Sequence, residues 1–306
     1  MRNAFCTVLI ELYRRRPFVF FTGDLGFMAL EPLQAAMGER FVNAGVAEQN
    51  MVSVAAGLAS GGEQCWAYSI APFVYARPFE QIRNDICLHD FDVKLVGNGG
   101  GYGYGAMGPT HHAIEDYGVL LPLQNMRVFL PSFADDVSAI VSRMAGTPHP
   151  AYLRLGLCEK PRASILPPYA PWRSLLSGGG GVMVVIGPSA GGILQGALQL
   201  PEEKRPEVWV LSELPLAVVP PPPQLLESIN RSGRLFVVEE HVVQGSVGQM
   251  LAYSLMAQGI CPRTFRHFCA EGYRSGLYGS QAFHRKESGL DADSVLSEVS
   301  RCLPTG

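Results

Sequence analysis

The sequence predicts an α/β protein of two domains, each organised around a mainly parallel sheet, and three observations support this fold class. The chain has 306 residues, about twice the length of an ordinary domain. Short apolar runs alternate with helix-like segments, which is typical of parallel sheets covered by helices. A stretch rich in proline and glycine interrupts this pattern near the middle of the chain, and the pattern then starts again.

The first half is expected to form one domain over residues 1–160. Its apolar runs have the length of buried strands, and its longer segments have the apolar spacing of helices. In chain order the expected elements are a helix at Ala4–Arg14, a strand at Phe18–Phe21, a helix at Val46–Ala59, strands at Val93–Val96 and Arg127–Leu130, and a helix at Ala134–Met144. Apolar runs without polar alternation indicate a sheet that is covered on both faces.

Residues 161–181 are expected to be a linker, because prolines and then a run of four glycines fill this stretch. The second, smaller α/β domain is expected over residues 182–306. Its expected elements are strands at Val182–Ile186, Val208–Leu211 and Leu235–Glu239, and helices at Gly191–Leu200 and Ser246–Ala257. The run Pro220–Pro223 is expected to be an extended surface connector, since proline fits neither a central strand nor a helix interior.

Composition excludes several classes of protein. The 24 Lys and Arg against 27 Asp and Glu give a net charge of −3, without the basic surface expected of a nucleic-acid or membrane-surface protein. The seven cysteines are scattered and never spaced Cys-x-x-Cys, which argues against a disulfide framework and a zinc knuckle. The chain has neither a signal-peptide pattern nor an apolar stretch of membrane-spanning length. We therefore expect a soluble, unprocessed cytoplasmic protein.

One carboxylate, Glu48, lies at the start of a helix that is otherwise small and apolar. A glutamate in a first turn is favoured by the helix dipole, and position alone indicates no more than that. However, Gly45, Ala47, Ala55 and Ala56 surround it in sequence and would let a ligand or another backbone approach closely. A carboxyl group in such surroundings is suited to acid–base chemistry, so Glu48 is a candidate catalytic residue.

A glycine-rich loop over residues 97–108 ends in two histidines. Its glycines at 103, 105 and 108 match the spacing of a dinucleotide-binding loop after an apparent strand. A helix should begin at that point, but Pro109, Thr110 and His111 intervene, so we reject the nucleotide interpretation. Adjacent histidines by themselves could merely satisfy buried backbone groups.

Both segments resemble the transketolase family. Residues 45–51, Gly-Val-Ala-Glu-Gln-Asn-Met, are similar to its Gly-Ile-Ala-Glu-Gln-Asn-Met segment, and residues 108–111 to its Gly-Pro-Thr-His loop. The resemblance covers nearly the whole chain. It implies a thiamine diphosphate-binding fold with a pyrimidine-binding domain followed by a transketolase C-terminal domain. It also implies that Glu48 bonds the aminopyrimidine ring of the cofactor and activates it, and that His111 contacts the substrate.

The resemblance implies further cofactor contacts. An aromatic residue should stack on the aminopyrimidine, and Phe73 is the first choice, with Tyr75 second. Asp24 and Leu25 resemble the Ala-Asp-Leu that follows the first strand in the family, and they are expected to line the cofactor pocket from a neighbouring subunit.

The substrate pocket departs from the family pattern. By alignment through residues 108–111, an aspartate that reads a donor hydroxyl is replaced by Met107, and a histidine that helps to bind the sugar phosphate is replaced by Gly99. The two family arginines have counterparts in Arg2 and Arg154. Each lost charge-assisted contact is worth roughly 1.5–3 kcal/mol, so an altered donor or acceptor is expected.

The family's diphosphate-binding domain, with its Gly-Asp-Gly triplet and a later Asn, has no match here. A diphosphate needs a helix N-terminus and a metal held by oxygen ligands. We therefore expect no metal site in this chain, and a separately encoded partner subunit that holds Mg²⁺ or Ca²⁺. The chain is then the C-terminal subunit of a split transketolase, in an α2β2 heterotetramer that also self-associates through both domains. It is expected to transfer a two-carbon ketol or acyl unit to an aldehyde or related acceptor.

Three alternatives stay open. The chain could be a 1-deoxyxylulose-5-phosphate synthase-like subunit with pyruvate as donor, since Met107 reads no hydroxyl. It could be like the E1 β subunit of a 2-oxo acid dehydrogenase, although the Gly-Pro-Thr-His ending favours transketolase. It could also be a non-catalytic regulatory subunit, although Glu48 and His111 argue against lost turnover.

Overall fold

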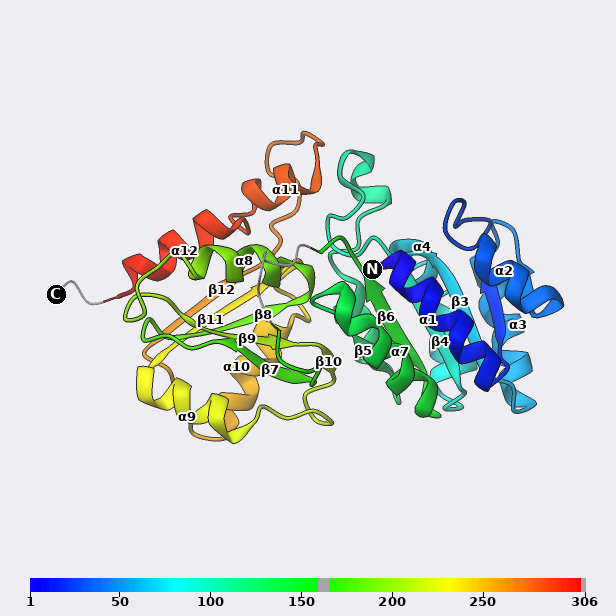
Figure 1. Cartoon of the computed structure of the whole chain (residues 1–306), viewed down its shortest axis with the longest axis horizontal. Helices are drawn as coiled ribbons and strands as arrows, with labels where there is room; N and C mark the ends of the chain where they lie inside the picture. The colour runs from blue at the N-terminus through cyan, green and yellow to red at the C-terminus, as the bar shows by residue number, and fades with distance from the viewer. Residues whose placement is uncertain (159–165, 304–306) are drawn as a thin grey trace.

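Two sheets lie side by side in the protein, each with helices packed on it (Figure 1). The structure is a computed structural model that describes residues 1–158 and 166–303. The first sheet has seven strands in the order β10-β5-β6-β4-β3-β1-β2, and the second has five in the order β12-β11-β8-β9-β7. Of these described strands, only β10 and β7 pair antiparallel to their neighbours. The predicted α/β class with mainly parallel sheets is confirmed.

The first sheet is built mainly from the N-terminal half of the chain. Its strands are β1 (Val19–Thr22), β2 (Phe41–Asn43), β3 (Cys65–Ile70), β4 (Val93–Asn98), β5 (Arg127–Phe129), β6 (Ala151–Leu155) and β10 (Glu213–Leu214). Its helices are α1 (Arg2–Arg15), α2 (Glu31–Met37), α3 (Glu48–Ser60), α4 (Ala71–Tyr75), α5 (Phe79–Gln81), α6 (Asp116–Leu120) and α7 (Val137–Gly146), with a π-helical turn at Ile82–Cys87 and short 3-10 turns at Gly38–Arg40, Gly105–Thr110 and Ala134–Asp136.

The period of two along β1 explains how both faces of this sheet become covered. Phe18 and Phe20 pack in a cluster with α1 and α7, whereas Val19 and Phe21 pack in a cluster with α3 and α4. Every residue of β1 is buried, as expected for a parallel strand between two helical layers.

The second sheet follows the same plan with fewer elements. Its strands are β7 (Trp172–Leu176), β8 (Val182–Ile186), β9 (Glu207–Leu211), β11 (Arg234–Glu239) and β12 (Thr264–Phe268). Its helices are α8 (Ala190–Ala197), α9 (Pro223–Ser232), α10 (Val247–Ala257), α11 (Gln281–Glu287) and α12 (Ala292–Arg301), with a 3-10 turn at Gly187–Ser189. Helices α8 and α12 contribute to one apolar cluster of this sheet, and α9 and α10 contribute to another.

The predicted linker contains regular structure. Its first five residues, 161–165, lie outside the described residues, but β7 occupies Trp172–Leu176 and pairs with β9. The prolines end at Pro171, so the chain beyond it has free N–H groups for a sheet edge, and Trp172 is buried there. The glycines after β7 let the chain pass close to backbone, since a Cβ at Gly178 would lie 2.2 Å from the carbonyl oxygen of Arg205. The domain limits themselves stay a prediction.

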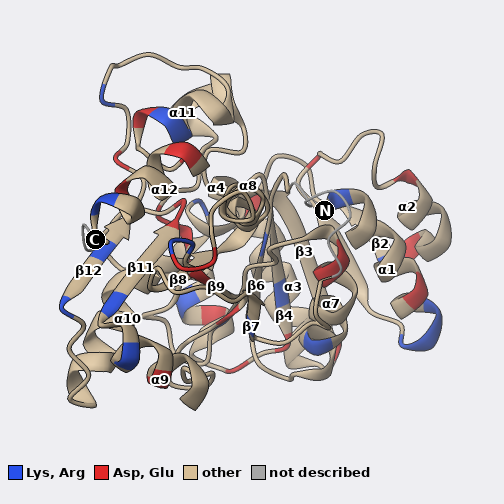
Figure 2. Cartoon of the chain, turned by 60° about the vertical axis from the view of Figure 1, so that its left-hand side comes forward, with Lys and Arg blue, Asp and Glu red and all other residues tan. Residues whose placement is uncertain are grey.

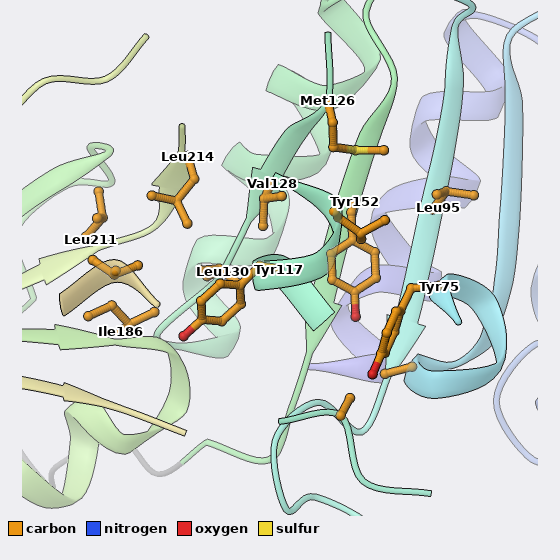
Figure 3. Close-up of a cluster of buried hydrophobic side chains, with 14 of the residues drawn as sticks. Tyr75, Leu95, Tyr117, Met126, Val128, Leu130, Tyr152, Ile186, Leu211 and Leu214 are labelled. Atoms are coloured by element: carbon orange, nitrogen blue, oxygen red, sulfur yellow. The ribbon is translucent and has the colours of Figure 1, made fainter. Parts of the chain in front are cut away.

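The two sheets also share one apolar cluster. Strand β10 comes from the C-terminal half of the chain, yet it pairs with β5 in the first sheet. Figure 3 shows Leu214 and Leu211 on one side of this cluster and Tyr75 and Tyr152 on the other. This continuity means that the two sheets pack as one unit.

The predicted proline connector ends where α9 begins, because Pro223 occupies a first-turn position at which its missing N–H costs no hydrogen bond.

Basic and acidic side chains occur over both halves of the chain, with most of the ribbon carrying neither (Figure 2). Among the described residues, no helix is long and apolar enough to cross a bilayer.

Candidate active site

The candidate site lies where parallel strands of the first sheet end. The carboxyl ends of β1, β2, β3 and β4 lead into the segments that carry Gly23, Glu48, Phe73 and the glycine-rich loop. Open parallel sheets commonly bind ligands at this edge. Glu48 is the first residue of α3, and Gly45 makes the preceding turn with a φ of +71°. The side chain of Asn43 braces that turn by accepting the Gly45 N–H at 3.0 Å.

Glu48 is a buried carboxylate with two polar partners. It is 3% exposed. Ser69 donates its hydroxyl to Oε1 at 3.1 Å, and Nη1 of Arg77 lies 2.8 Å from Oε2. The space beside this carboxylate depends on Gly23, because a Cβ there would lie 3.3 Å from both Oε1 and the Ser69 hydroxyl. A buried carboxylate is costly unless it is paired, so Ser69 and Arg77 stabilise its position.

Phe73 and Tyr75, the two predicted stacking residues, point in different directions. The guanidinium carbon of Arg77 lies 3.6 Å from the ring centroid of Phe73, so Phe73 is next to the Glu48 group. Tyr75 is buried in the cluster of Figure 3, where its hydroxyl lies 3.5 Å from Glu115 and burial raises its pKa. Residues two apart on a helix point to nearly opposite sides, which explains the difference. The arrangement favours Phe73 over Tyr75 as the stacking residue, because Tyr75 does not reach the group around Glu48.

His111 lies beside Phe73. The centroids of the two rings are 5.2 Å apart at an interplanar angle of 62°. The Thr110 hydroxyl is 2.8 Å from Nδ1 of His111, and this contact orients the imidazole. The other neighbour is Tyr104, whose ring centroid is 5.7 Å from that of His111 and whose hydroxyl accepts a hydrogen bond from Asn98. Glu48, Arg77, Phe73 and His111 therefore form one contiguous group.

The predicted substrate residues Arg2 and Gly99 share a hollow of about 420 Å³ near this group. Tyr104 lines the hollow and also contacts His111, so it connects the two. Gly99 leaves room for the ring of Tyr104, because a Cβ at Gly99 would lie 2.2 Å from it. The position at which the family resemblance expects a histidine is thus filled by a tyrosine that comes from farther along the loop.

Met107 and Arg154 lie elsewhere. Met107 is 54% exposed on the outer part of the loop. Arg154 is 7% exposed; its Nε lies 3.2 Å from Asp116, and its Nη2 donates to the backbone carbonyls of Ala113 and Glu240. These contacts connect the two halves of the chain. The charge of Arg154 is thus matched inside the protein, and the structure does not bring it to the group around Glu48; its predicted contact with a substrate stays a prediction.

Asp24 and Leu25 line a separate, smaller hollow of about 110 Å³ at the end of β1. Asp24 is exposed with a φ of +57°, and its carboxylate accepts a hydrogen bond from Nδ2 of Asn43 at 2.9 Å. Both residues follow Gly23 directly. Their predicted contact with a cofactor of a neighbouring subunit stays a prediction.

A buried network joins the two sheets behind the site. Tyr117 of α6 donates a short hydrogen bond to Glu239 at the end of β11, and His267 lies 2.7 Å from the same carboxylate. Burial alone would raise the pKa of Glu239, but hydrogen bonds from His267, Tyr117 and Gly248 hold it below its usual value. His241 stacks on Tyr117 with ring centroids 3.9 Å apart.

The residue set suits the pyrimidine end of thiamine diphosphate. It offers a buried carboxylate, a flat aromatic face next to it, and a glycine that keeps the approach open. Within residues 1–158 and 166–303, no group of three or more His, Cys, Asp and Glu side chains is placed to hold a metal ion. The residues around Glu48 therefore fit the ring of the cofactor.

Sequence reasoning missed Ser69, Arg77 and Tyr104. Arg77 follows Phe73 by four residues and lies in the turn just after α4; on a helix this spacing places two side chains on one face. That signal could have identified it. Tyr104 reaches His111 only through the fold of a loop rich in glycines with positive φ, which has no such period.

Comparisons with known proteins identify the family. Residues 1–156 match the domain family described as "Transketolase, pyrimidine binding domain". The chain is 32% identical over 270 residues to a protein of Actinobacillus succinogenes named as one subunit of apulose-4-phosphate transketolase, covering 87% of this chain and 86% of that protein. It is 28% identical to "1-deoxy-D-xylulose-5-phosphate synthase 2" of Geobacter sulfurreducens, covering 85% of this chain but 42% of that protein. A solved structure described as "Split gene transketolase, inactive beta4 tetramer" superposes with a TM-score of 0.82 at 31% identity, covering 99% of this chain and 97% of that one.

Proposed function

Since the chain belongs to the transketolase family as a C-terminal subunit, we propose that it supplies the pyrimidine side of a thiamine diphosphate site to a transferase completed by a second polypeptide. The single observation that carries this proposal is the group around Glu48. A buried carboxylate, 3% exposed, lies beside Phe73 and His111 at the carboxyl edge of a parallel sheet.

The proposed roles follow from these positions. When bound, thiamine diphosphate supplies a nucleophilic carbon and then accepts the electron pair released by the donor. Glu48 would exchange a proton with the aminopyrimidine ring, and Ser69 would hold the carboxylate in place for that exchange. Phe73 would support the ring face. His111, oriented by Thr110, would hold or move a proton at the substrate oxygen, a role that typically contributes about 10²–10⁴-fold to the rate.

The need for a partner is part of the proposal. The sequence lacks the Gly-Asp-Gly triplet with which the family binds its diphosphate, and a diphosphate requires a metal and backbone N–H donors. Support also comes from the structural neighbour, a β4 tetramer that is described as inactive. We propose an α2β2 assembly in which the other subunit holds the diphosphate and Mg²⁺ or Ca²⁺, and in which this chain also contacts its own copies.

The proposed reaction transfers a two-carbon unit from a phosphorylated ketose. The relative from A. succinogenes is named for apulose 4-phosphate. Gly99, which lines the hollow near the group around Glu48, carries no polar side chain, and this favours a donor other than the usual sugar phosphates. The similarity to a 1-deoxy-D-xylulose-5-phosphate synthase keeps pyruvate as a second candidate donor. Turnover of apulose 4-phosphate, xylulose 5-phosphate and pyruvate by the reconstituted complex separates the candidates, and preference for xylulose 5-phosphate would contradict an altered donor.

The test of the mechanism is Glu48→Gln in the complex with the partner subunit. This change keeps the shape of the side chain and removes its proton exchange, so we expect kcat to fall by about 100-fold or more. Steady-state kinetics with saturating cofactor measures it, and the isolated chain should show no cofactor-dependent turnover. The matched control is Glu39→Gln, at an exposed position, which should leave kcat unchanged. Full activity of the Glu48 variant would refute the proposed role and leave the regulatory alternative.

A further inference from the structure

Arg77 makes two contacts that the proposed function reserves for the cofactor. Its guanidinium carbon lies 3.6 Å from the ring centroid of Phe73, and its Nη1 lies 2.8 Å from Oε2 of Glu48. The proposed function places the aminopyrimidine in the same way: it is a planar group with N–H donors, stacked on Phe73 and bonded to Glu48. Arg77 therefore makes the contacts that the bound ring would make. The guanidinium is planar and weakly hydrated, and it stacks well on aromatic rings, so it can imitate such a ring.

The two planar groups cannot share this position. A ring stacked on the Glu48 side of Phe73 needs the space that the guanidinium occupies, since stacked planar groups cannot both lie 3.6 Å from one ring face. They also compete for one carboxylate, whose other oxygen already accepts the hydroxyl of Ser69. Binding of the pyrimidine therefore requires Arg77 to move.

Arg77 is free to move without disturbing the core. Its side chain is 41% exposed, whereas that of Glu48 is 2% exposed. It follows the end of α4, so no helical hydrogen bonding depends on its rotamer. A half-exposed cation thus lies over a buried carboxylate.

We propose that Arg77 is a placeholder for the pyrimidine ring: it pairs with the buried carboxylate of Glu48 in one state of the site and leaves when the cofactor binds. This inference rests on the proposed function, because it assumes that Glu48 and Phe73 hold the aminopyrimidine. The pairing keeps Glu48 from being a buried, unpaired charge before binding, and it opposes cofactor binding by the same interaction. Arg77 therefore sets how tightly and how fast the cofactor is taken up.

The test compares Arg77→Met with the wild type, both as full-length chains in complex with the partner subunit. Methionine keeps most of the length and loses the charge and the fork of donors. We expect the Kd for thiamine diphosphate with Mg²⁺, measured by calorimetry, to fall about tenfold, which equals about 1.4 kcal/mol. The association rate measured by stopped flow should rise and lose the saturation with cofactor concentration that a prior release step imposes on the wild type.

Two further variants sharpen the result. Arg77→Lys keeps the charge without a planar group, so its affinity should lie between those of the wild type and Arg77→Met. Arg231→Met removes an arginine from the exposed surface of α9 and should leave the affinity unchanged. Circular dichroism spectra of all variants check that they fold.

The possible outcomes distinguish this inference from the proposed function. If every complex binds the cofactor but Arg77→Met binds it more weakly than, or as tightly as, the wild type, Arg77 is a cofactor ligand or a bystander and the placeholder is wrong. If neither the wild type nor Arg77→Met binds thiamine diphosphate, the proposed function fails and the placeholder fails with it.

Discussion

The adjacent histidines, His111 and His112, are expected to act differently because their surroundings differ. His111 is partly exposed beside Phe73, with Thr110 bonded to its Nδ1. His112 is buried, and both of its ring nitrogens are engaged, by the Tyr273 hydroxyl at 2.9 Å and the Gly105 carbonyl oxygen at 2.8 Å. His111 is therefore accessible, as its proposed substrate role requires, whereas His112 holds the loop against the C-terminal half.

We predict that His111→Ala lowers kcat by about 100-fold and leaves the melting temperature unchanged, because general acid–base groups contribute about 10²–10⁴-fold and this side chain carries no core packing. His112→Ala should instead lower the melting temperature, since it removes the partner of the buried Gly105 carbonyl oxygen, at about 1–3 kcal/mol, and a contact of the partly buried Tyr273 hydroxyl. Kinetics and calorimetry on the complex check both. Equal effects of the two substitutions on kcat would contradict this division.

At the scale of elements, the glycine-rich loop positions His111 by a close fit to the C-terminal half. Gly108 has a φ of +71°, and a Cβ there would lie 3.2 Å from the ring of Tyr278. Gly105 has a φ of +51°, and its Cβ would lie 3.1 Å from the carbonyl oxygen of Gly279. A side chain at either position would be strained by the positive φ and would press against its neighbour.

We therefore predict that Gly108→Ala lowers both stability and kcat. A side chain at this positive φ is strained by about 1 kcal/mol or more, and relief of the strain displaces the following residues, including His111. Urea unfolding and steady-state kinetics measure the two effects. The control is Gly192→Ala within α8, which meets nothing within 4 Å and should stabilise the protein by about 0.5–1 kcal/mol. A Gly108 variant with wild-type kcat would show that the loop tolerates displacement.

The elements also show what local pattern can and cannot predict. The apolar run Val182–Ile186 coincides with β8, and Phe18–Phe21 differs from β1 by one residue, because a buried strand needs only a local apolar run. Strand β10 has no such signal: Glu213 and Leu214 become a strand only because Phe129 and Val128 offer backbone groups opposite them. Likewise, the residues around β7 are rich in proline and glycine and predict a linker, whereas β7 forms a strand because it pairs with β9.

The candidate site divides in the same way. Glu48, Phe73 and His111 could be predicted because short motifs carry them, and the structure brings them together. Arg154 could not be placed, because its burial depends on Asp116 and Glu240, which come from segments far from it in sequence. A linear motif records which residue type follows another, but it does not record which distant group matches a charge.

At the scale of the whole molecule, His241 makes hydrogen bonds that connect the two sheets, and these bonds require a neutral imidazole. Its Nε2 accepts the N–H of Gly118 at 3.1 Å, while Nδ1 lies 2.7 Å from the carbonyl oxygen of Val242 and donates to it. A protonated imidazole would have two donors and no acceptor, so protonation would break the contact with Gly118. Burial lowers the pKa of His241, even though the carboxylates of Asp116 and Glu239 oppose that shift.

This arrangement predicts that stability falls on mild acidification. Because the pKa of His241 is lower in the folded state than in the unfolded one, the unfolded chain binds more protons once the pH drops below about 6.5. The free energy of unfolding should therefore decrease from about pH 7 towards about pH 5, and His112, whose pKa burial also lowers, should add to the decrease. Glu239, whose pKa is held below its usual value, contributes a further loss only at pH values below about 4.5.

The variant His241→Gln isolates the contribution of this residue, because glutamine keeps a donor and an acceptor but does not titrate. Urea unfolding at steps from about pH 7.5 to about pH 5 should show a shallower pH dependence than in the wild type. The exposed His89→Gln serves as the control and should leave the slope unchanged. If the free energy of unfolding of the His241 variant depends on pH as steeply as that of the wild type, the contact between the two sheets tolerates a charged imidazole. The acid sensitivity would then arise away from the interface that holds the loop of His111 in place.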